Sequence, residues 1–412
     1  MADEGFGLGK LLTAAEEAPP VESVGVVARH LEQRFGAFSV SFLFADIVGR
    51  EVVRFTGDSG GDGKGEGPGG RSAGIALPGS IYEGVLRTQA PHVEELEGGI
   101  GHRAVAPVTN RGDCLGVLEV SLPGADDEAL RGIEEAAHAL AYIIVTDRRF
   151  TDLYHWGRRT TRVSLAAEIQ HQLLPSASCC EAAAFTVAGA LVPADQIGGD
   201  TYDYALDREL LHLSITDAMG HEVDSALLAT LLMGALRGAR RAGEGLTEQA
   251  TRAHDALLAH GRGAMATGQL MFVDLERGEA QIVNAGHPRP LLMRGDEVEE
   301  VPLFPHLPFG IPSPIPYEAQ KLDLRPGDRL LLLTDGMQER QAADVDLGAL
   351  LRETRELHPR EAARRITGTV FDVCRGHLRD DATILLLDWR GSEPRSRRAT
   401  SGADTTAASR AD

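Results

Sequence analysis

The sequence predicts an α+β protein of two folded domains joined by a connecting helix. Its 412 residues are enough for two or three domains of ordinary size, and 43% hydrophobic with 25% charged residues is typical of a globular chain. Runs with helical spacing and runs of strand type occur in both halves, and strands dominate the second half. Each half is therefore expected to mix helices with sheets.

The net charge of −20 argues against a nucleic-acid partner and against docking on an anionic membrane, because both need a basic surface. The chain has no apolar run of membrane-spanning length, and its start, MADEGFGLGK, is unlike a signal peptide. Its cysteines fit neither a zinc site nor a disulfide framework, since two of the four, Cys179 and Cys180, are adjacent. We expect a cytoplasmic protein with reduced thiols and no nucleic-acid or membrane partner.

The N-terminal half predicts a flexible leader at 1–20 and a small domain at 21–146. Helical spacing covers 21–35, and SVSFLFADI with EVVRF alternates like a hairpin. A second hairpin is predicted over 102–124, and a helix follows from Asp126. This order, with APVTNRGDCLGVLEV, resembles a GAF-type sensor domain, which implies an unknown small-molecule or protein signal. An unrelated small α+β domain is the alternative.

Residues 147–175 predict a linker helix between the domains, ended by Pro175. One narrow apolar seam steps by three and four along it: Val163, Ala166, Ile169 and Leu173. Such a seam either pairs with a second copy, making a homodimer, or packs on the chain's own domains, and the sequence leaves both open. The polar tail at 391–412 is predicted to be disordered.

Asp217 poses the central question of the second half, because it ends the run LHLSIT, where a carboxylate is costly to desolvate. One answer is that Asp217 caps the helix that follows. Three further stretches carry acids at a turn or a strand end: IGGDTYD with Asp200 and Asp203, LLLLTDGMQE with Asp335, and RDDATILLLDW with Asp380 and Asp381. Carboxylates gathered at one rim of a sheet repel one another unless cations neutralise them. Oxygen ligands without a histidine or cysteine cluster favour Mg²⁺ or Mn²⁺.

Five ordered motifs resemble the type 2C metal-dependent (PPM-type) protein serine/threonine phosphatases: IGGDTYDY, ITDAMGH, NAGHPRPLL, PGDRLLLLTDGMQE and DDATILLL. The resemblance is to the bacterial branch of stage II sporulation and stress-response phosphatases. The stretch AAEIQHQLLP also resembles the linker helix of that branch. The resemblance implies an α-β-β-α sandwich of two antiparallel sheets at 183–390, with a binuclear metal site at one rim.

The resemblance also implies a role for each acid. Asp217 would bridge two Mn²⁺ or Mg²⁺ ions. Asp200 and the carbonyl of Ala218 would hold one ion, and Asp335 and Asp380 would hold the other. These four aspartates would be catalytic through a metal-bound water, because two ions about 3.5–4 Å apart lower the pKa of a shared water.

The implied reaction is the hydrolysis of phosphoserine or phosphothreonine by that water, without a phosphoenzyme. The implied substrate is a phosphorylated anti-sigma-factor antagonist. Asp381 and Asp203 are expected to support the site or cap turns rather than to bind metal.

Four positions near the motifs bear on the mechanism. Met219 stands where eukaryotic members carry a histidine proposed as general acid, and Glu222 stands where the branch usually has glycine. His221 and His287 are expected to be structural.

Two other functions stay open. A sensor scaffold whose phosphatase-like domain is catalytically silent would bind metal without turnover. Gly198-Gly199-Asp200 is also similar to the GGDEF hairpin of diguanylate cyclases, but that interpretation leaves TDGM and DDAT unexplained.

Overall fold

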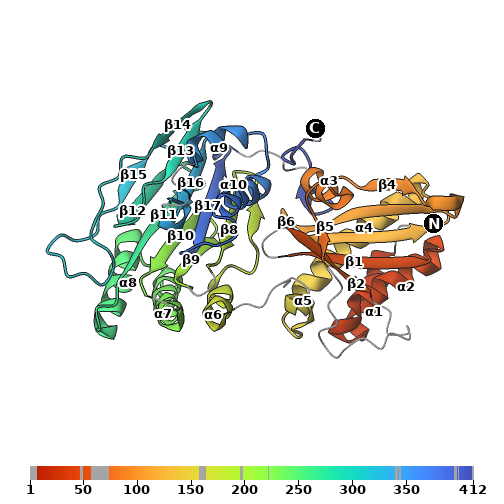
Figure 1. Cartoon of the computed structure of the whole chain (residues 1–412), viewed down its shortest axis with the longest axis horizontal. Helices are drawn as coiled ribbons and strands as arrows, with labels where there is room; N and C mark the ends of the chain where they lie inside the picture. The colour runs from red at the N-terminus through yellow and green to blue at the C-terminus, as the bar shows by residue number, and fades with distance from the viewer. Residues whose placement is uncertain are drawn as a thin grey trace. The chain divides into compact units, whose positions relative to one another are not determined.

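The computed structural model describes residues 7–46, 50–56, 74–156, 164–194, 198–220, 222–338, 342, 345–393, 397 and 399–410. The chain divides into two compact units: unit 1 comprises residues 1–162 and 397–412, and unit 2 comprises residues 163–396. Each unit has its own sheets, helices and core (Figure 1). No described helix is long and apolar enough to cross a membrane.

Unit 1 is built on a six-stranded antiparallel sheet of order β3-β2-β1-β6-β5-β4. Side chains alternate across a strand, so β1 sends Phe42 and Phe44 to one face and Leu43 to the other. The first face packs on α1, α2 and α4, and the second packs on α3. The elements are α1 (Leu8–Glu17), α2 (Ser23–Phe35), β1 (Ser39–Ala45), β2 (Glu51–Thr56), β3 (Ile75–Ala76), α3 (Ile81–Thr88), β4 (His92–Glu95), β5 (His102–Asn110), β6 (Asp113–Leu122), α4 (Asp127–Asp147) and α5 (Leu153–Trp156), with 3₁₀ turns at Pro20–Glu22 and Glu97–Gly99.

The helix predicted over 21–35, both hairpins and the helix after Asp126 are confirmed as α2, β1–β2, β5–β6 and α4. Asp126 caps α4 by accepting a 2.8 Å hydrogen bond from the amide of Ala129. The β5–β6 turn has left-handed backbone at Arg111 and Gly112, with φ of 48° and 82°, as a two-residue hairpin turn requires.

Both ends of the chain are more ordered than the sequence predicts. Residues 8–17 of the expected flexible leader form α1, whose Leu11 is fully buried in the unit 1 core. In the expected disordered tail, β18 (Ala399–Thr400) and β19 (Ala403–Asp404) form a hairpin within unit 1. The amide of Gly112 donates a 3.1 Å hydrogen bond to the carbonyl of Gly402 in that hairpin. Long-range docking orders these segments, and local composition does not reveal it.

Unit 2 is a four-layer α-β-β-α sandwich, as predicted (Figure 1). One antiparallel sheet has the order β15-β12-β11-β10-β9 and the other the order β14-β13-β16-β17-β8-β7. One apolar cluster fills the space between the sheets, a second joins α7 and α8 to the first sheet, and a third joins α9 and α10 to the second sheet. The elements are α6 (Leu165–Leu173), β7 (Cys179–Glu181), β8 (Phe185–Val192), β9 (Asp200–Leu206), β10 (Leu210–Ala218), α7 (Glu222–Arg241), α8 (Leu246–His260), β11 (Ala266–Asp274), β12 (Ala280–Ala285), β13 (Leu291–Arg294), β14 (Glu297–Glu300), β15 (Gln320–Leu322), β16 (Arg329–Leu333), a 3₁₀ turn at Asp335–Gln338, α9 (Leu347–Glu353), α10 (Pro359–Val373) and β17 (Ala382–Trp389).

The structure differs from the single linker helix predicted over 147–175. Helix α4 ends at Asp147, and α6 packs within unit 2. The buried residues of α6 are Ala166, Ala167 and Gln170, whereas Ile169 and Leu173 of the predicted seam are only partly buried. Val163, the first residue of that seam, lies outside the described residues. The buried face is therefore rotated from the predicted one and includes a polar side chain.

Candidate metal centre

Strand parity places Asp217 at the edge of the inter-sheet core. Leu211, Leu213 and Ile215 of β10 point between the two sheets, and Asp217 continues the same face. Asp217 lies within β10 and α7 begins only at Glu222, so the alternative that Asp217 caps this helix is wrong.

The other acids reach the same rim from three further segments. Asp200 opens β9 directly opposite Asp217 in the β9–β10 pairing. Asp335 follows β16, and Asp380 with Asp381 precedes β17. We call these five residues the acidic rim. The structure thus brings together the four aspartates predicted as metal ligands, with Asp381 beside them.

Electrostatic repulsion is strong at the acidic rim. Asp200 and Asp381 are buried, Asp217 and Asp380 are partly buried, and Asp335 is exposed. Burial, together with the charges of Asp335, Asp380 and Asp381, raises the pKa of Asp217 to about 7. Burial also raises the pKa of Asp200 well above its usual value, and the charges of Asp217 and Asp381 act in the same direction. A buried carboxylate cluster of this kind calls for a cation.

Two glycines let the segments of the rim approach closely. A Cβ atom on Gly199 would lie 2.3 Å from the carbonyl oxygen of Ala218, and one on Gly336 would lie 2.0 Å from that of Asp381. Both distances are too short for any side chain. Each glycine thus allows close approach to the backbone of a neighbouring segment, at Ala218 and at Asp381.

Hydrogen bonds that the sequence did not predict hold the buried acids. The hydroxyl of Thr334 donates to Asp200 Oδ2 at 2.6 Å. Asp381 accepts from the amide of Ala194 at 2.8 Å and from Nε2 of Gln170 at 2.6 Å, one bond on each carboxylate oxygen. Because each carboxylate oxygen of Asp381 already accepts a hydrogen bond, a supporting role suits Asp381. In the sequence, Gln170 stands out only as part of the stretch AAEIQHQLLP, and the structure shows that it lies on the buried face of α6.

The remaining candidates occupy structural positions. Asp203 is buried and forms ion pairs with Arg237 at 3.0 Å and with Arg240 at 2.8 Å, so its charge is already compensated. His287 is buried, its Nδ1 lies 2.7 Å from the hydroxyl of Thr267, and burial lowers its pKa to about 3. Met219 is 49% exposed. His221 and the side chain of Glu222 lie outside what the structure describes.

The donor set fits a hard divalent cation, because it consists of carboxylate oxygens. Among the described residues, however, no group of three or more acidic, histidine or cysteine side chains is already closed around a single ion position.

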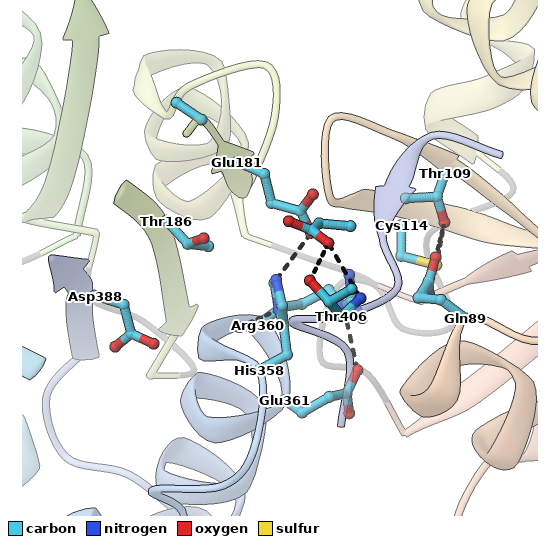
Figure 2. Close-up of polar contacts among 12 residues, drawn as sticks. Gln89, Thr109, Cys114, Glu181, Thr186, His358, Arg360, Glu361, Asp388 and Thr406 are labelled. Atoms are coloured by element: carbon cyan, nitrogen blue, oxygen red, sulfur yellow. Dashed lines mark hydrogen bonds and ion pairs between the residues drawn. The ribbon is translucent and has the colours of Figure 1, made fainter. Parts of the chain in front are cut away.

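A second buried polar cluster lies at the opposite end of β17, and we call it the far cluster (Figure 2). Arg329 forms a two-pronged ion pair with Asp388, with Nε–Oδ1 at 2.6 Å and a second bond at 2.9 Å. His358 caps α10 and lies 3.0 Å from Glu181. Glu361 pairs with two arginines, Arg360 and Arg364.

Comparisons with known proteins agree with this geometry. The family model described as stage II sporulation protein E (SpoIIE) matches residues 207–390. Phosphoserine phosphatase RsbP of Bacillus subtilis strain 168 is 26% identical over 202 residues, 47% of this chain and 49% of RsbP. Phosphoserine phosphatase RsbU of the same organism is 22% identical over 234 residues, 55% of this chain and 70% of RsbU. The chain thus spans about half the length of RsbP.

Two solved structures are also similar. The RsbU and RsbW domains of Rv1364c from Mycobacterium tuberculosis have a TM-score of 0.45 and 26% identity, covering 53% of this chain and 63% of that one. The PP2C phosphatase domain with a regulatory fragment of SpoIIE from Bacillus subtilis has a TM-score of 0.43 and 20% identity, covering 51% and 64%. The family match thus falls within unit 2, and the curated relatives that the chain resembles there are phosphoserine phosphatases.

Proposed function

We propose that this protein is a signal-regulated, metal-dependent phosphatase that hydrolyses phosphoserine or phosphothreonine in a protein substrate. The observation that carries the proposal is the acidic rim, where five aspartates from four segments meet and the charges of the described residues that act on Asp217 are all negative. Two Mn²⁺ or Mg²⁺ ions, when bound, would neutralise these charges and activate a water molecule.

The chain's own residues would hold and orient the site. Asp217, Asp200, Asp335, Asp380 and the carbonyl of Ala218 are the proposed metal ligands. The exposed position of Asp335 supports access for a phosphorylated side chain from solvent. His287 is an unsuitable general acid, since its low pKa leaves the buried ring without a proton to give at neutral pH.

Further parts of the proposal concern regulation. We propose that the substrate is a phosphorylated anti-sigma-factor antagonist, following the resemblance and the phosphoserine phosphatase relatives. Residues 21–146 would be a GAF-like sensor for a small molecule or protein, and the chain would work as a cytoplasmic homodimer. The adjacent Cys179 and Cys180 fit no disulfide framework, which suits a reducing compartment.

The test is hydrolysis of para-nitrophenyl phosphate by the full chain with added Mn²⁺. Asp217→Asn and Asp335→Asn should each lower kcat/KM about a thousandfold or more, because metal-assisted charge stabilisation is worth several kcal/mol. Asp255→Asn makes the same chemical change on the exposed face of α8 and should leave turnover unchanged.

A silent scaffold is the second candidate, because Met219 stands where eukaryotic members carry a histidine proposed as general acid. Mn²⁺ binding by the wild type without any turnover would support the scaffold and overturn the enzyme. Turnover that survives Asp217→Asn would overturn the proposed site.

A further inference from the structure

Gln170 is the only buried polar side chain of α6, and it is fully buried. Its Nε2 donates to Asp381 Oδ2 at 2.6 Å and to the backbone carbonyl of Asp200 at 2.8 Å. Both partners are acceptors, so the amide must present its NH₂ group to them. The orientation of the side chain is therefore set by the chemistry of the partners.

These two hydrogen bonds join the two sheets of the sandwich at the acidic rim. Asp200 begins β9 of the five-stranded sheet, and Asp381 precedes β17 of the six-stranded sheet. No backbone pairing connects β9 with β17, because each sheet's ladder is separate. Gln170 is thus a tie between two groups of acids whose mutual repulsion pushes them apart.

Helix α6 is itself anchored at its other end. Arg237 of α7 donates from its guanidinium Nη2 to the carbonyl of Leu173 at 2.5 Å. Arg237 also pairs with the buried Asp203 of β9. Ser164 caps the start of α6 through the amide of Ala167 at 3.2 Å. The contact between Arg237 and Leu173 fixes the C-terminal end of α6, which limits how far Gln170 can follow a shift of Asp381.

We propose that Gln170 is a positioning residue that sets the spacing between the Asp200 and Asp381 segments, and through it the affinity of the acidic rim for divalent metal. The inference rests on the metal site of the proposed function, and it assigns Gln170 no contact with substrate. Hydrogen-bonded residues around metal ligands commonly contribute about 10–100-fold to metal affinity.

The test compares Gln170→Met with Gln172→Met in the full chain. Methionine keeps the length and volume but donates no hydrogen bond, and Gln172 is an exposed glutamine on the same helix. Mn²⁺ binding is measured without substrate, from the electron paramagnetic resonance signal of free Mn²⁺. Gln170→Met should weaken binding about tenfold or more, and Gln172→Met should match the wild type.

Turnover gives a second, separate readout. Gln170→Met should raise the Mn²⁺ concentration for half activation by the same factor, with kcat returning toward the wild-type value at saturating Mn²⁺. Wild-type Mn²⁺ affinity in Gln170→Met would overturn the inference, even if its melting temperature falls, because Gln170 would then be a structural contact alone.

Two outcomes separate this inference from the proposed function. Wild-type protein that binds Mn²⁺ but turns over no phosphate ester would overturn the enzyme and leave the binding comparison decisive for Gln170. Wild-type protein that binds no Mn²⁺ would overturn both. If Gln170→Met does not fold, Gln170→Asn keeps the amide but is one methylene shorter, and unchanged Mn²⁺ affinity there would equally overturn the inference.

Discussion

Buried acids at the two ends of β17 have opposite electrostatic surroundings. At the far cluster each carboxylate faces a partner that offers positive charge or a proton: Asp388 faces Arg329, and Glu361 faces Arg360 and Arg364. Glu181 faces His358 (Figure 2). At the acidic rim the charges that act on Asp217 are all negative. Strand β17 therefore has carboxylates with favourable partners at one end and carboxylates that repel Asp217 at the other.

The pKa values follow this difference. Burial pushes the pKa of Glu361 up, but Arg360 and Arg364 pull it below its usual value. Burial pushes the pKa of Asp217 and of Asp381 up to about 7, and neighbouring acids add to the rise. Burial alone therefore does not mark a functional acid. The sign of the charges that neighbour a buried acid indicates whether it is functional.

The largest effect on stability is expected from a substitution that breaks the far cluster. Arg329→Met removes a 4% exposed cation, leaving Asp388 and the carbonyls of Thr354 and Leu357 without their donor. Unfolding free energy should fall by about 3–5 kcal/mol, the usual cost of breaking a buried pair. Urea unfolding of the metal-free protein measures it. The control Arg355→Met removes a 46% exposed arginine and should cost less than about 1 kcal/mol. An equal loss in both variants would contradict the comparison.

The next effect has the opposite sign. Asp217→Asn should raise the unfolding free energy of the metal-free protein at pH 7.5 by about 1–3 kcal/mol, because it removes a repelled charge at about 1.4 kcal/mol per pKa unit. The same urea experiment measures it, with Asp255→Asn as the unchanged control. Destabilisation by Asp217→Asn would mean that the rim is already compensated.

The last prediction concerns pH. Asp217 and Asp381 have folded pKa values of about 7, above the unfolded value of about 3.9, so the folded state holds more protons between these values. Metal-free stability should therefore decrease as pH rises from about 4 to about 7. Since Mn²⁺ competes with protons, it should raise the melting temperature more at pH 8 than at pH 5 in a thermal shift assay. A larger rise at pH 5 would refute this account of the rim.

The resemblance of the ordered motifs to a known family was sufficient to predict the sandwich, and local patterns were sufficient to identify the rim acids. The run Leu211, Leu213, Ile215 has the period of a strand, so the position of Asp217 on the buried face follows from counting by two. The hairpin predicted over 102–124 and the helix after Asp126 depended on equally local patterns, and both are confirmed. The metal roles of these acids remain predictions.

Other features depend on contacts between segments far apart in the chain. The sequence determined which acids are present and at which strand ends they lie, because alternation and turn chemistry act over a few residues. Only the tertiary structure decided that Gln170 ties Asp200 to Asp381, that Asp203 is neutralised by arginines of α7, and that the tail hairpin joins unit 1. These partners are about 30 to over 200 residues apart, and no local pattern records the packing that brings such distant groups together.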